Sequence, residues 1–574
     1  MNWPVCSIAE ATAKLTAPGA PFAMREEQVA GQKLRTYVEA PSTMRQVIDA
    51  SRAYGERDFL VYGEERISFE AHWRAVQTLG RALATEFGIQ KGDRVAVAMR
   101  NFPEWSACAF AAMAVGAIFV PLNAWESGPN LASMIHRSGA RVVFVDRERR
   151  ERIVDLAPDV RLITVRTDDD ASSIETIIGT PADWAELPDD PAPDRGLAPD
   201  DPVTISFTSG TTGMAKGALA THRMVLTNLI NTQFRVARAA VRRGEDWPPA
   251  PAASQQTVLL PLPLFHVTGL HSALVPALAR GNRLVMMYRW DLPRAIELIA
   301  RHKVNILILV PTLVVQLLEH LPEGGRPDLQ SLHTVTYGGS PAAADLAEGV
   351  VSRFPGAAPA QGYGATETSS LVASNSHEDL LLRPRSVGTP VPCCDIRIVD
   401  EAELDVPEGE PGELWVRGPQ VFAGYWEQPE ATAEALTDGW YRTGDIVRRD
   451  EEGFLYVLDR KKDMVIRGGE NVYCSEVEAA IGRIPGVLEC AVFGLPDRVL
   501  GETVAAWVVT RGEIAAGTVS ERLAASLAGF KVPSDIRVSR EPLPRNAAGK
   551  VLKRQLRDAM IAERESSGSE PIEG

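Results

Sequence analysis

Short apolar runs rich in β-branched residues alternate with longer amphipathic stretches over much of the chain. Residues 69–87 place apolar side chains at helical spacing, whereas the short runs have the length and composition of strands. Alternation of strand, helix and strand predicts an α/β fold with largely parallel sheets. The strand-like runs are residues 94–100 (RVAVAMR), 141–146 (RVVFVD), 203–209 (VTISFTS), 305–312 (NILILVPT) and 334–340 (TVTYGGS).

The pattern changes twice towards the C-terminus. Residues 386–456 contain short strand-like runs separated by glycine, proline and acidic turns, which predicts a small antiparallel β unit. After residues 459–463 (DRKKD) the order helix, strand, strand predicts a separate α+β domain. The 574 residues are also too many for one ordinary core. We therefore predict a multidomain α/β protein, with two α/β subdomains and the β unit in residues 1–459 and a small C-terminal domain in residues 460–574.

Composition indicates a water-soluble globular protein. Apolar residues make up 45% and charged residues 24% of the chain, and the net charge of −15 argues against a general nucleic-acid binder. Residues 106–124 carry no charge, but Gly116 and Pro121 favour a helix followed by a short buried strand over a membrane span. Peripheral contact with a membrane stays open, and the N-terminus lacks the pattern of a signal peptide.

The cysteines indicate a reduced, cytoplasmic protein. None forms a C-x-x-C pair and no histidine cluster accompanies them. The cysteines are Cys6, Cys108, Cys393, Cys394, Cys474 and Cys490.

The sequence does not specify the oligomeric state, and a homodimer is one option.

Residues 205–217 (ISFTSGTTGMAKG) follow a predicted strand and combine hydroxyls, glycines and one lysine. Exposed N–H groups, hydroxyl donors and a mobile cation suit a polyphosphate. The spacing departs from the Walker pattern G-x-x-x-x-G-K-[ST], because Ala215 and Gly217 stand at two of its fixed positions. A flexible linker is the alternative, and a linker seldom follows a buried strand and ends on a lone lysine.

Residues 361–367 (QGYGATE) contain groups suited to a nucleotide. Tyr363 offers a flat face for a purine, the glycines allow close approach, and Glu367 is able to hold a Mg²⁺ that bridges phosphate oxygens. Taken alone, the segment is also compatible with an ordinary glycine turn.

An ordered set of segments resembles the adenylate-forming (ANL) superfamily, in its acyl-CoA synthetase or fatty-acid–CoA ligase branch. Beside the two segments above, the set includes residues 261–270 (PLPLFHVTGL), 337–341 (YGGSP), 441–445 (YRTGD), 459–478 (DRKKDMVIRGGENVYCSEVE) and 542–557 (PLPRNAAGKVLKRQLR). The resemblance covers residues from about 59 to 557. It implies an AMP-binding adenylation domain in residues 1–459 and a mobile domain with a catalytic lysine in residues 460–574.

The resemblance implies which residues bind ATP and AMP. Asp445 would hold the ribose hydroxyls and Arg460 would reach the nucleotide, while Glu367 and Thr211 would bind Mg²⁺. Thr366 would lie near the α-phosphate and the acyl carboxylate. The full nucleotide set is Thr208, Ser209, Gly210, Thr211, Thr212, Gly213, Lys216, Gly339, Ser340, Gln361, Gly362, Tyr363, Gly364, Asp445 and Arg460.

The resemblance also implies a mobile C-terminal domain. Asp459 would be its hinge, and Lys550 would swing into the active site during adenylation. Gly468 and Gly469 would line the pantetheine tunnel for CoA; an ordinary β-turn is the alternative, and the two are compatible. The chain departs from the family pattern at Asn546, where threonine is usual, and at Ala215, where proline is usual.

The acid is indicated by residues 261–270, in which Phe265 and His266 would border the acyl carboxylate and the thiol entrance. Residues 267–270 contain no carboxylate, which favours an acid without an amine. A roomy apolar pocket predicts medium- or long-chain fatty acids first, with aryl or steroid-side-chain acids behind. Acetate is disfavoured because we expect no tryptophan near the wall positions. The predicted acyl pocket is Phe265, Thr268, Gly269, Val310, Gly338 and Gly339.

The predicted activity is an ATP-dependent acid–CoA ligase. It would form acyl-CoA from a carboxylic acid, CoA and ATP through an acyl-adenylate, with Mg²⁺ and release of AMP and pyrophosphate. Alternatives are a fatty acyl-AMP ligase that feeds a carrier protein, disfavoured by the lack of an insertion after the hinge, and a non-catalytic binding module of the same fold. The predicted catalytic residues are Lys550, Glu367, His266 and Thr366.

Overall fold

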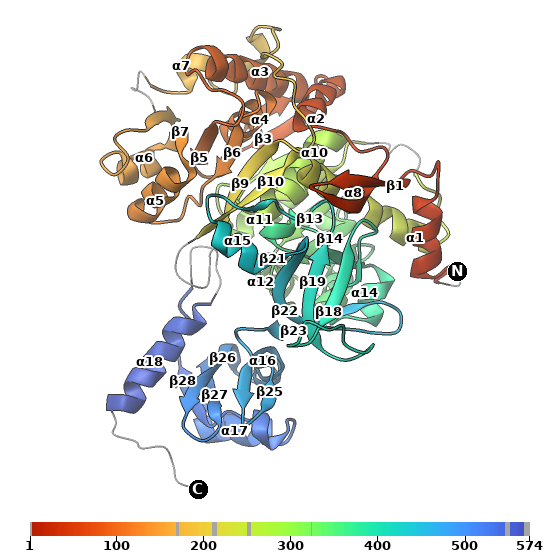
Figure 1. Cartoon of the computed structure of the whole chain (residues 1–574), viewed down its shortest axis with the longest axis vertical. Coiled ribbons are helices and arrows are strands. Elements are labelled where there is room, and N and C mark those ends of the chain that lie inside the picture. Colours follow the sequence, from red (N-terminus) through yellow and green to blue (C-terminus); the bar gives the residue numbers. More distant parts are fainter. Residues whose placement is uncertain are drawn as a thin grey trace. The chain divides into compact units, whose positions relative to one another are not determined.

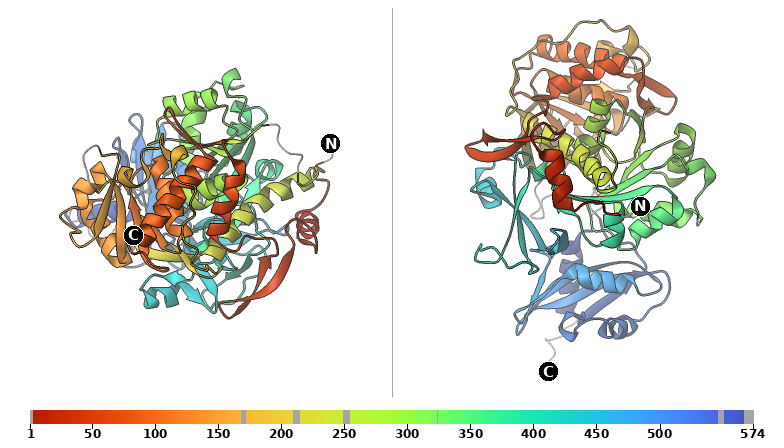
Figure 2. Two further views of the ribbon diagram at one scale, coloured as in Figure 1. Left: turned by 90° about the horizontal axis from the view of Figure 1, so that it is seen from above. Right: turned by 90° about the vertical axis from the view of Figure 1, so that its right-hand side faces the viewer.

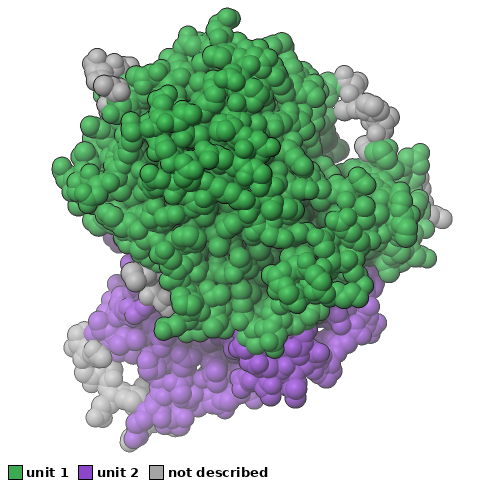
Figure 3. All heavy atoms as spheres, turned by 45° about the horizontal axis from the view of Figure 1, so that its top comes forward, with its two compact units in different colours: residues 1–396, 416–441 green, residues 397–415, 442–574 purple. Residues whose placement is uncertain are grey.

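The computed structural model divides into two units, coloured separately in Figure 3. Unit 1 comprises Met1–Ile396 and Val416–Tyr441, and unit 2 comprises Arg397–Trp415 and Arg442–Gly574. The division predicted after residue 459 separates a domain that is expected to move and to carry the catalytic lysine. The two compact units do not test that division, and it stays a prediction. The structure describes residues 3–167, 172–208, 215–248, 254–322, 324–545 and 551–566.

Unit 1 contains a seven-stranded sheet in the order β20-β10-β9-β6-β5-β7-β8 (Figure 1). Its middle strands are parallel, and β9–β10 and β10–β20 are antiparallel. Three of the strand-like runs correspond to β5, β7 and β9, as predicted. The strands are β5 (Arg94–Ala98), β6 (Ile118–Pro121), β7 (Ala140–Asp146), β8 (Arg161–Val165), β9 (Pro202–Thr208), β10 (Lys216–Thr221) and β20 (Gly424–Tyr425).

A nine-stranded sheet of unit 1 has the order β17-β16-β15-β14-β13-β11-β12-β3-β4. The strands from β3 to β15 in this order are parallel, and antiparallel strands close both edges. The runs at residues 305–312 and 334–340 correspond to β13 and β14, as predicted. The strands are β3 (Asp58–Tyr62), β4 (Glu65–Ser68), β11 (Thr257–Leu260), β12 (Arg283–Met286), β13 (Ile306–Leu309), β14 (Thr334–Gly338), β15 (Ala358–Tyr363), β16 (Ala373–Ser376) and β17 (Thr389–Pro390).

Helices cover both sheets. The N-terminal segment packs against one of these helices, α8. The helix α1 and the hairpin of β1 and β2 lie beside α8 (Figure 2). The helices and N-terminal strands are α1 (Ile8–Thr16), β1 (Met24–Val29), β2 (Gln32–Tyr37), α2 (Met44–Ser51), α3 (Phe69–Thr85), α4 (Pro103–Ala114), α5 (Gly128–Ser138), α6 (Arg147–Ile153), α7 (Glu175–Ile178), α8 (His222–Arg242), α9 (Val267–Gly269), α10 (Val275–Arg280), α11 (Leu292–His302), α12 (Pro311–His320), α13 (Leu346–Arg353), α14 (Glu378–Leu382) and α15 (Pro429–Ala435).

The uncharged stretch at residues 106–124 belongs to the core. Every residue of α4 is buried, and β6 follows it, so the predicted helix and short buried strand are confirmed. A helix that is apolar on all sides must be enclosed by other elements. Phe110 and neighbours such as Phe59 and Leu79 form the largest buried cluster, where each side chain of this size stabilises the fold by ~1.5–3 kcal/mol. Among the described residues, no helix is long and apolar enough to cross a membrane.

Residues 395–460 form the predicted antiparallel β unit. Its sheet has the order β18-β19-β22-β21, with β23 beside β22. The bounds are β18 (Asp395–Val399), β19 (Gly412–Arg417), β21 (Leu436–Thr437), β22 (Trp440–Arg449) and β23 (Leu455–Arg460).

The C-terminal part of unit 2 is an α+β fold, as predicted. Its sheet has the order β25-β24-β27-β26, with β28 beside β27. One buried cluster joins the sheet to α16 and α17, and another joins it to α18. The elements are β24 (Val465–Arg467), β25 (Glu470–Val472), α16 (Cys474–Gly482), β26 (Val487–Asp497), β27 (Gly501–Thr510), α17 (Ala516–Ala524), β28 (Asp535–Ser539) and α18 (Lys553–Ser566).

Candidate active site

Four neighbouring parallel strands of the nine-stranded sheet end at one edge, and a predicted site segment follows each of them. Because carboxyl ends of parallel strands share an edge, the sheet gathers segments that are far apart in the sequence, which is where ligands bind in such folds. The segments are Phe265–His266 after β11, Val310 after β13, Gly339–Ser340 after β14 and residues 364–367 after β15.

Glu367 lies in a short 3-10 helix, Thr366–Thr368, directly after the turn that follows β15. Only glycine fits at Gly364, because an added Cβ would lie 1.3 Å from the Ser370 carbonyl oxygen. The buried Glu367 carboxylate accepts a hydrogen bond from the Tyr425 hydroxyl through Oε1, at 2.8 Å. Burial, and then the adjacent carboxylate, raise the pKa of Tyr425 well above its usual value, so this hydroxyl keeps its proton and donates.

Lys216 approaches the same tyrosine. Its Nζ lies 5.0 Å from the centre of the Tyr425 ring, within the range of a cation–π contact. Tyr425 is placed there because β20 pairs with β10, with Ala218 opposite Tyr425. The predicted phosphate-loop lysine and the predicted magnesium carboxylate therefore share one aromatic residue, which the sequence prediction missed.

The predicted phosphate loop connects β9 to β10. Thr208 and Lys216 are opposite each other in the antiparallel register, and the Thr208 hydroxyl donates to the Lys216 carbonyl at 3.3 Å. A Walker loop leads into a helix, whereas this loop leads into a strand, which agrees with the departure of its sequence from the Walker spacing. The predicted loop residues Ser209, Gly210, Thr211, Thr212 and Gly213 lie outside the described residues.

The predicted adenine segment ends β15. Gln361, Gly362 and Tyr363 are its last three residues, and Gly362 is opposite Gly338 of β14. Gln361 is buried, and within the described part of the chain its Oε1 has no hydrogen-bond partner. The close β14–β15 approach requires glycine at position 338, because an added Cβ would lie 2.5 Å from the Gly362 oxygen.

Phe265 and His266 stand before a short helical turn, Val267–Gly269, and their ring centres are 4.6 Å apart. Trp125 meets the buried Phe265 edge-on, at 5.3 Å between ring centres. The expectation that no tryptophan lies near the wall positions Thr268, Gly269, Val310, Gly338 and Gly339 stays a prediction. The fold brings Trp125 across a long stretch of sequence to Phe265, the aromatic residue expected beside the acyl carboxylate.

The other predicted acyl-pocket positions differ in their surroundings. Thr268 and Val310 are half-buried, and Gly339 has open space where a Cβ would be. Gly269 is buried, and its Cβ would lie 2.2 Å from the Pro263 oxygen. Close backbone packing thus accounts for glycine at position 269 independently of any acid.

In unit 2, Asp445 and Arg460 are opposite each other on β22 and β23. Arg460 Nε lies 2.7 Å from Asp445 Oδ1, and Asp445 is buried while the arginine side chain is partly exposed. The predicted ribose carboxylate and the predicted nucleotide arginine are therefore cross-strand partners. The sequence analysis assigned a role to each of these two residues separately and did not predict that they pair.

Asp459, the predicted hinge, is buried at the end of β23. Its Oδ1 accepts the Arg460 N–H at 2.8 Å and its Oδ2 accepts the Ser475 N–H at 3.4 Å. Burial raises the pKa of this carboxyl. Gly468 and Gly469 form the two-residue turn between β24 and β25, with φ of 59° and 90°, so the β-turn interpretation is confirmed.

The predicted catalytic lysine, Lys550, lies outside the described residues, as does Asn546. Arg545 and Val551, which flank that segment, form an antiparallel bridge, and α18 follows.

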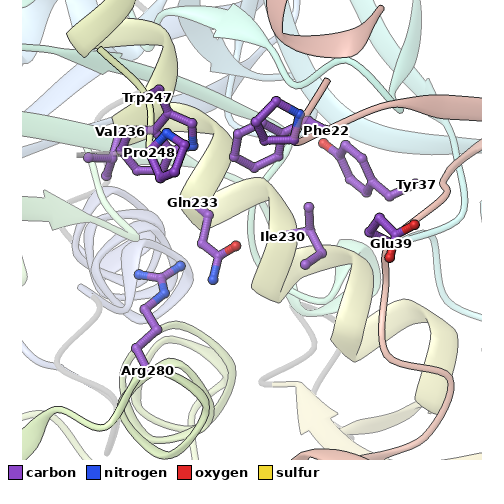
Figure 4. Close-up of a pocket in the computed structure, with 10 residues that line it drawn as sticks. Phe22, Tyr37, Glu39, Ile230, Gln233, Val236, Trp247, Pro248 and Arg280 are labelled. Atoms are coloured by element: carbon purple, nitrogen blue, oxygen red, sulfur yellow. The ribbon is translucent and has the colours of Figure 1, made fainter. Parts of the chain in front are cut away.

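A cavity of about 350 Å³ lies in unit 1, lined by residues of the N-terminal segment, α8 and their neighbours (Figure 4). Phe22, Tyr37 and Trp247 contribute aromatic walls, with Gln233 of α8 and Arg280 beside them. None of the predicted acyl-pocket residues lines this cavity.

The residues present suit Mg²⁺. Among the described residues, no group of three or more acidic, histidine or cysteine side chains could hold a metal. Mg²⁺ is commonly held by one or two carboxylates together with substrate phosphates and water. The single buried Glu367 carboxylate, oriented by Tyr425, fits that mode of binding.

Comparisons with known proteins agree with this arrangement. The family model "AMP-binding enzyme" matches residues 48–426, and "AMP-binding enzyme C-terminal domain" matches residues 476–550. A feruloyl-CoA synthase of Amycolatopsis sp is 34% identical over 86% of this chain and 94% of that protein. A long-chain-fatty-acid–CoA ligase of Escherichia coli O6:H1 is 32% identical over 88% of this chain and 92% of that protein.

Solved structures show the same fold. The o-succinylbenzoate CoA synthetase of Bacillus subtilis, in complex with the acyl-adenylate intermediate OSB-AMP, has a TM-score of 0.75 and 28% identity, covering 91% of this chain and 99% of that one. The same enzyme in complex with ATP and magnesium ion has a TM-score of 0.74, with coverage of 89% and 98%.

The fold and the sheet-edge site define an enzyme that binds AMP, and the chain belongs to the AMP-binding enzyme family. Within this family it is an AMP-forming acid–CoA ligase of the acyl-CoA synthetase branch. ATP, Mg²⁺ and CoA are the usual requirements of such ligases. The predicted family, fold class and type of activity are confirmed.

Proposed function

We propose that this enzyme joins a medium- or long-chain fatty acid, or another bulky apolar acid, to CoA. The observation that carries the proposal is the gathering of Phe265–His266, Val310, Gly339–Ser340 and Glu367 beyond four adjacent parallel strands. This edge brings the predicted acid-binding segment and the predicted nucleotide-binding segment together.

The first half-reaction joins the acid to AMP. A carboxylate oxygen attacks the α-phosphorus, the bond between the α-phosphorus and the oxygen that bridges it to the β-phosphorus breaks, and pyrophosphate leaves. Because two anions must meet, the site needs cations and preorganised donors. Lys216 and the loop hydroxyls hold the β- and γ-phosphates, and Thr366 and Lys550 stabilise charge at the α-phosphate. Glu367 and Thr211 would hold Mg²⁺, which would supply positive charge to the phosphates.

The nucleoside is held by Tyr363 at the base and Asp445 at the ribose. A carboxylate accepts two hydrogen bonds from a cis-diol, and the Arg460 contact orients the Asp445 carboxylate for them. Arg460 then contacts the nucleotide itself. These roles come from the family resemblance. The ion pair between Asp445 and Arg460 in unit 2 supports them.

In the second half-reaction the CoA thiol attacks the acyl carbonyl and AMP leaves. Lys550 must withdraw for a thiol to enter, and a hinge at Asp459 between residues 1–459 and 460–574 meets that need. Gly468 and Gly469 leave room for the pantetheine arm in addition to forming their turn. His266 borders the thiol entrance.

An aryl acid is the second candidate substrate. Trp125 contacts Phe265 edge-on and Phe265 lies beside His266, and an aromatic pair of this kind suits a flat ring. The similar proteins include both a feruloyl-CoA synthase and a long-chain-fatty-acid–CoA ligase, so neither class of acid is favoured by likeness alone.

We also propose that the enzyme is cytoplasmic. All six cysteines are free, as expected of a reduced compartment.

A panel of acids tests the proposal. Pyrophosphate release from ATP is measured with fatty acids of increasing length, aryl acids, acetate and amino acids, with and without CoA, and scored by kcat/KM. Fatty or bulky apolar acids should lead and amino acids should fail. Preference for acetate or for an amino acid would overturn the assignment of the acid, and an aryl acid in the lead would select the second candidate.

A further inference from the structure

Asn228 of α8 links the two segments that the reaction must bring together. Its side chain is fully buried. Nδ2 donates to the His271 carbonyl at 2.9 Å, and Oδ1 accepts the Leu371 N–H at 3.0 Å. His271 lies shortly after Phe265–His266 in the chain, and Leu371 lies shortly after Glu367. One amide therefore satisfies one backbone group from each segment.

Two further contacts run parallel to this link. His271 Nδ1 lies 3.3 Å from the Ser369 carbonyl, and the hydroxyls of Ser272 and Ser370 are 2.8 Å apart. A carbonyl oxygen only accepts, so Nδ1 of His271 carries the proton in this contact. Burial lowers the pKa of His271 to about 4, and the ring is neutral near pH 7. We call these contacts, together with those of Asn228, the Asn228 seam.

The backbone beside the seam is held in an unusual conformation. Ser369 and Ser370 have φ of 53° and 114°, a region that L-residues other than glycine rarely adopt. Such a backbone persists only where its surroundings determine it. The seam supplies those restraints: it holds the Ser369 carbonyl, the Ser370 hydroxyl and the Leu371 N–H, two to four residues after Glu367.

The seam bears directly on the chemistry. Attack on the α-phosphorus requires the carboxylate oxygen to be held close to it and in line, and a misplacement of about 1 Å can cost about a hundredfold in rate. We infer that Asn228 is a positioning residue that fixes the acid-binding segment, residues 265–274, relative to the nucleotide-binding segment, residues 361–371. It touches no reacting atom and acts through the backbone. The inference rests on the proposed adenylation of an acid at this edge.

Asn231 provides a matched control. It lies three residues further along α8, is equally buried, and accepts hydrogen bonds from the Tyr37 hydroxyl at 2.7 Å and the Cys393 thiol at 3.3 Å. It belongs to neither segment. Asn231→Ala therefore removes a buried asparagine from the same helix without opening the seam.

Separate measurements of the two half-reactions distinguish a loss of positioning from a loss of stability. Asn228→Ala should lower kcat/KM for adenylation, measured by ATP–pyrophosphate exchange, by about tenfold or more. The rate of thiolysis of supplied acyl-adenylate should stay within about twofold of the parent's rate, because the acyl–phosphate bond already joins the acyl group to AMP. Asn231→Ala should lower Tm but leave both half-reactions within about twofold of the parent. Asn228→Asp, which keeps the shape but replaces the donor to His271 with an ionisable carboxyl oxygen, is the second variant if the alanine variant fails to fold.

Hydrogen exchange tests the seam without any turnover. Peptides that cover residues 267–274 and 366–372 should exchange faster in Asn228→Ala than in the parent or in Asn231→Ala. Equal effects of the two variants on adenylation, equal slowing of both half-reactions, or unchanged exchange in these peptides would overturn the inference. If the parent activates no acid at all, the proposed function fails, and the exchange measurement still decides whether the seam exists.

Discussion

The Tyr425 hydroxyl donates a hydrogen bond to Glu367 Oε1 at 2.8 Å. The same ring lies 5.0 Å from Lys216 Nζ and meets Phe422 edge-on, with ring centres 4.9 Å apart. The Phe422 N–H in turn donates to the Glu367 carbonyl at 2.7 Å. Tyr425 thus orients the carboxylate proposed to bind Mg²⁺ and contacts the lysine proposed to bind phosphate.

Removal of that hydroxyl should weaken Mg²⁺ binding. Tyr425→Phe keeps the ring face for Lys216 and loses only the donor to Glu367. Residues that orient a metal ligand typically contribute about 10- to 100-fold to metal affinity, so the Mg²⁺ concentration for half-maximal adenylation should rise by about tenfold. A Mg²⁺ titration of ATP–pyrophosphate exchange, with calorimetry of ATP binding at varied Mg²⁺, measures it.

Tyr456→Phe is the matched control for that experiment. Tyr456 donates to Asp450 Oδ2 at 3.0 Å, a tyrosine–carboxylate pair that none of the proposed roles includes. An unchanged Mg²⁺ dependence in Tyr425→Phe, or the same shift in both variants, would show that the Tyr425 contact has no part in metal binding.

Lys550→Ala should separate the two half-reactions. Loss of a cation that stabilises charge at the α-phosphate should slow adenylation by about a hundredfold or more, whereas thiolysis of supplied acyl-adenylate should be spared. Arg554→Ala removes the same charge from an exposed position on α18 and should change neither. Equal loss of both half-reactions in Lys550→Ala would refute this division of labour.

Ala215→Pro should affect ATP and not the acid. Ala215 precedes Lys216 at the start of β10, and proline would fix φ near −65° and reduce the entropy of the unliganded loop. Such substitutions are worth ~0.4–1 kcal/mol, so KM for ATP should fall by about two- to fivefold. Steady-state kinetics with two acids checks it, and a changed preference between the acids would mean that the loop also shapes the acyl pocket.

Stability should fall as the medium becomes acidic. His222 is buried and its Nδ1 accepts the Met44 N–H at 3.1 Å, and burial lowers its pKa from 6.5 to about 4. Between these values the unfolded chain binds a proton that the folded chain does not. The stabilisation is therefore complete above pH 6.5 and is lost as the pH falls to about 4, by ~3 kcal/mol for a shift of this size.

Denaturant titrations across this pH range measure the effect. His222→Gln, which cannot take up the proton, should show a shallower fall in the free energy of unfolding than the parent. Parallel curves for the two proteins would exclude His222 as a source of the pH dependence.

Much of the fold could be predicted because its strands and helices leave local patterns. β5, β7 and β9 are β-branched runs, and the enclosed position of α4 explains an apolar stretch that resembles a membrane segment. The site segments could be identified through the family resemblance, and Val310 and Gly339–Ser340 also lie at the ends of the predicted strand-like runs at residues 305–312 and 334–340.

The residues that sequence reasoning missed are those that act across the fold. Tyr425, Trp125 and Asn228 contact Glu367, Phe265 and the two site segments from distant elements. Nothing in their own neighbourhoods indicates those contacts, because periodicity specifies which face of an element is buried but not which remote side chain it meets.

The most direct test follows an oxygen atom. A carboxylic acid labelled with ¹⁸O in both carboxylate oxygens is turned over with ATP and CoA, and the products are analysed by mass spectrometry. If the carboxylate attacks the α-phosphorus and AMP then leaves on thiol attack, each AMP carries one ¹⁸O and pyrophosphate carries none. Label found in pyrophosphate or inorganic phosphate, or AMP without label, would contradict the account.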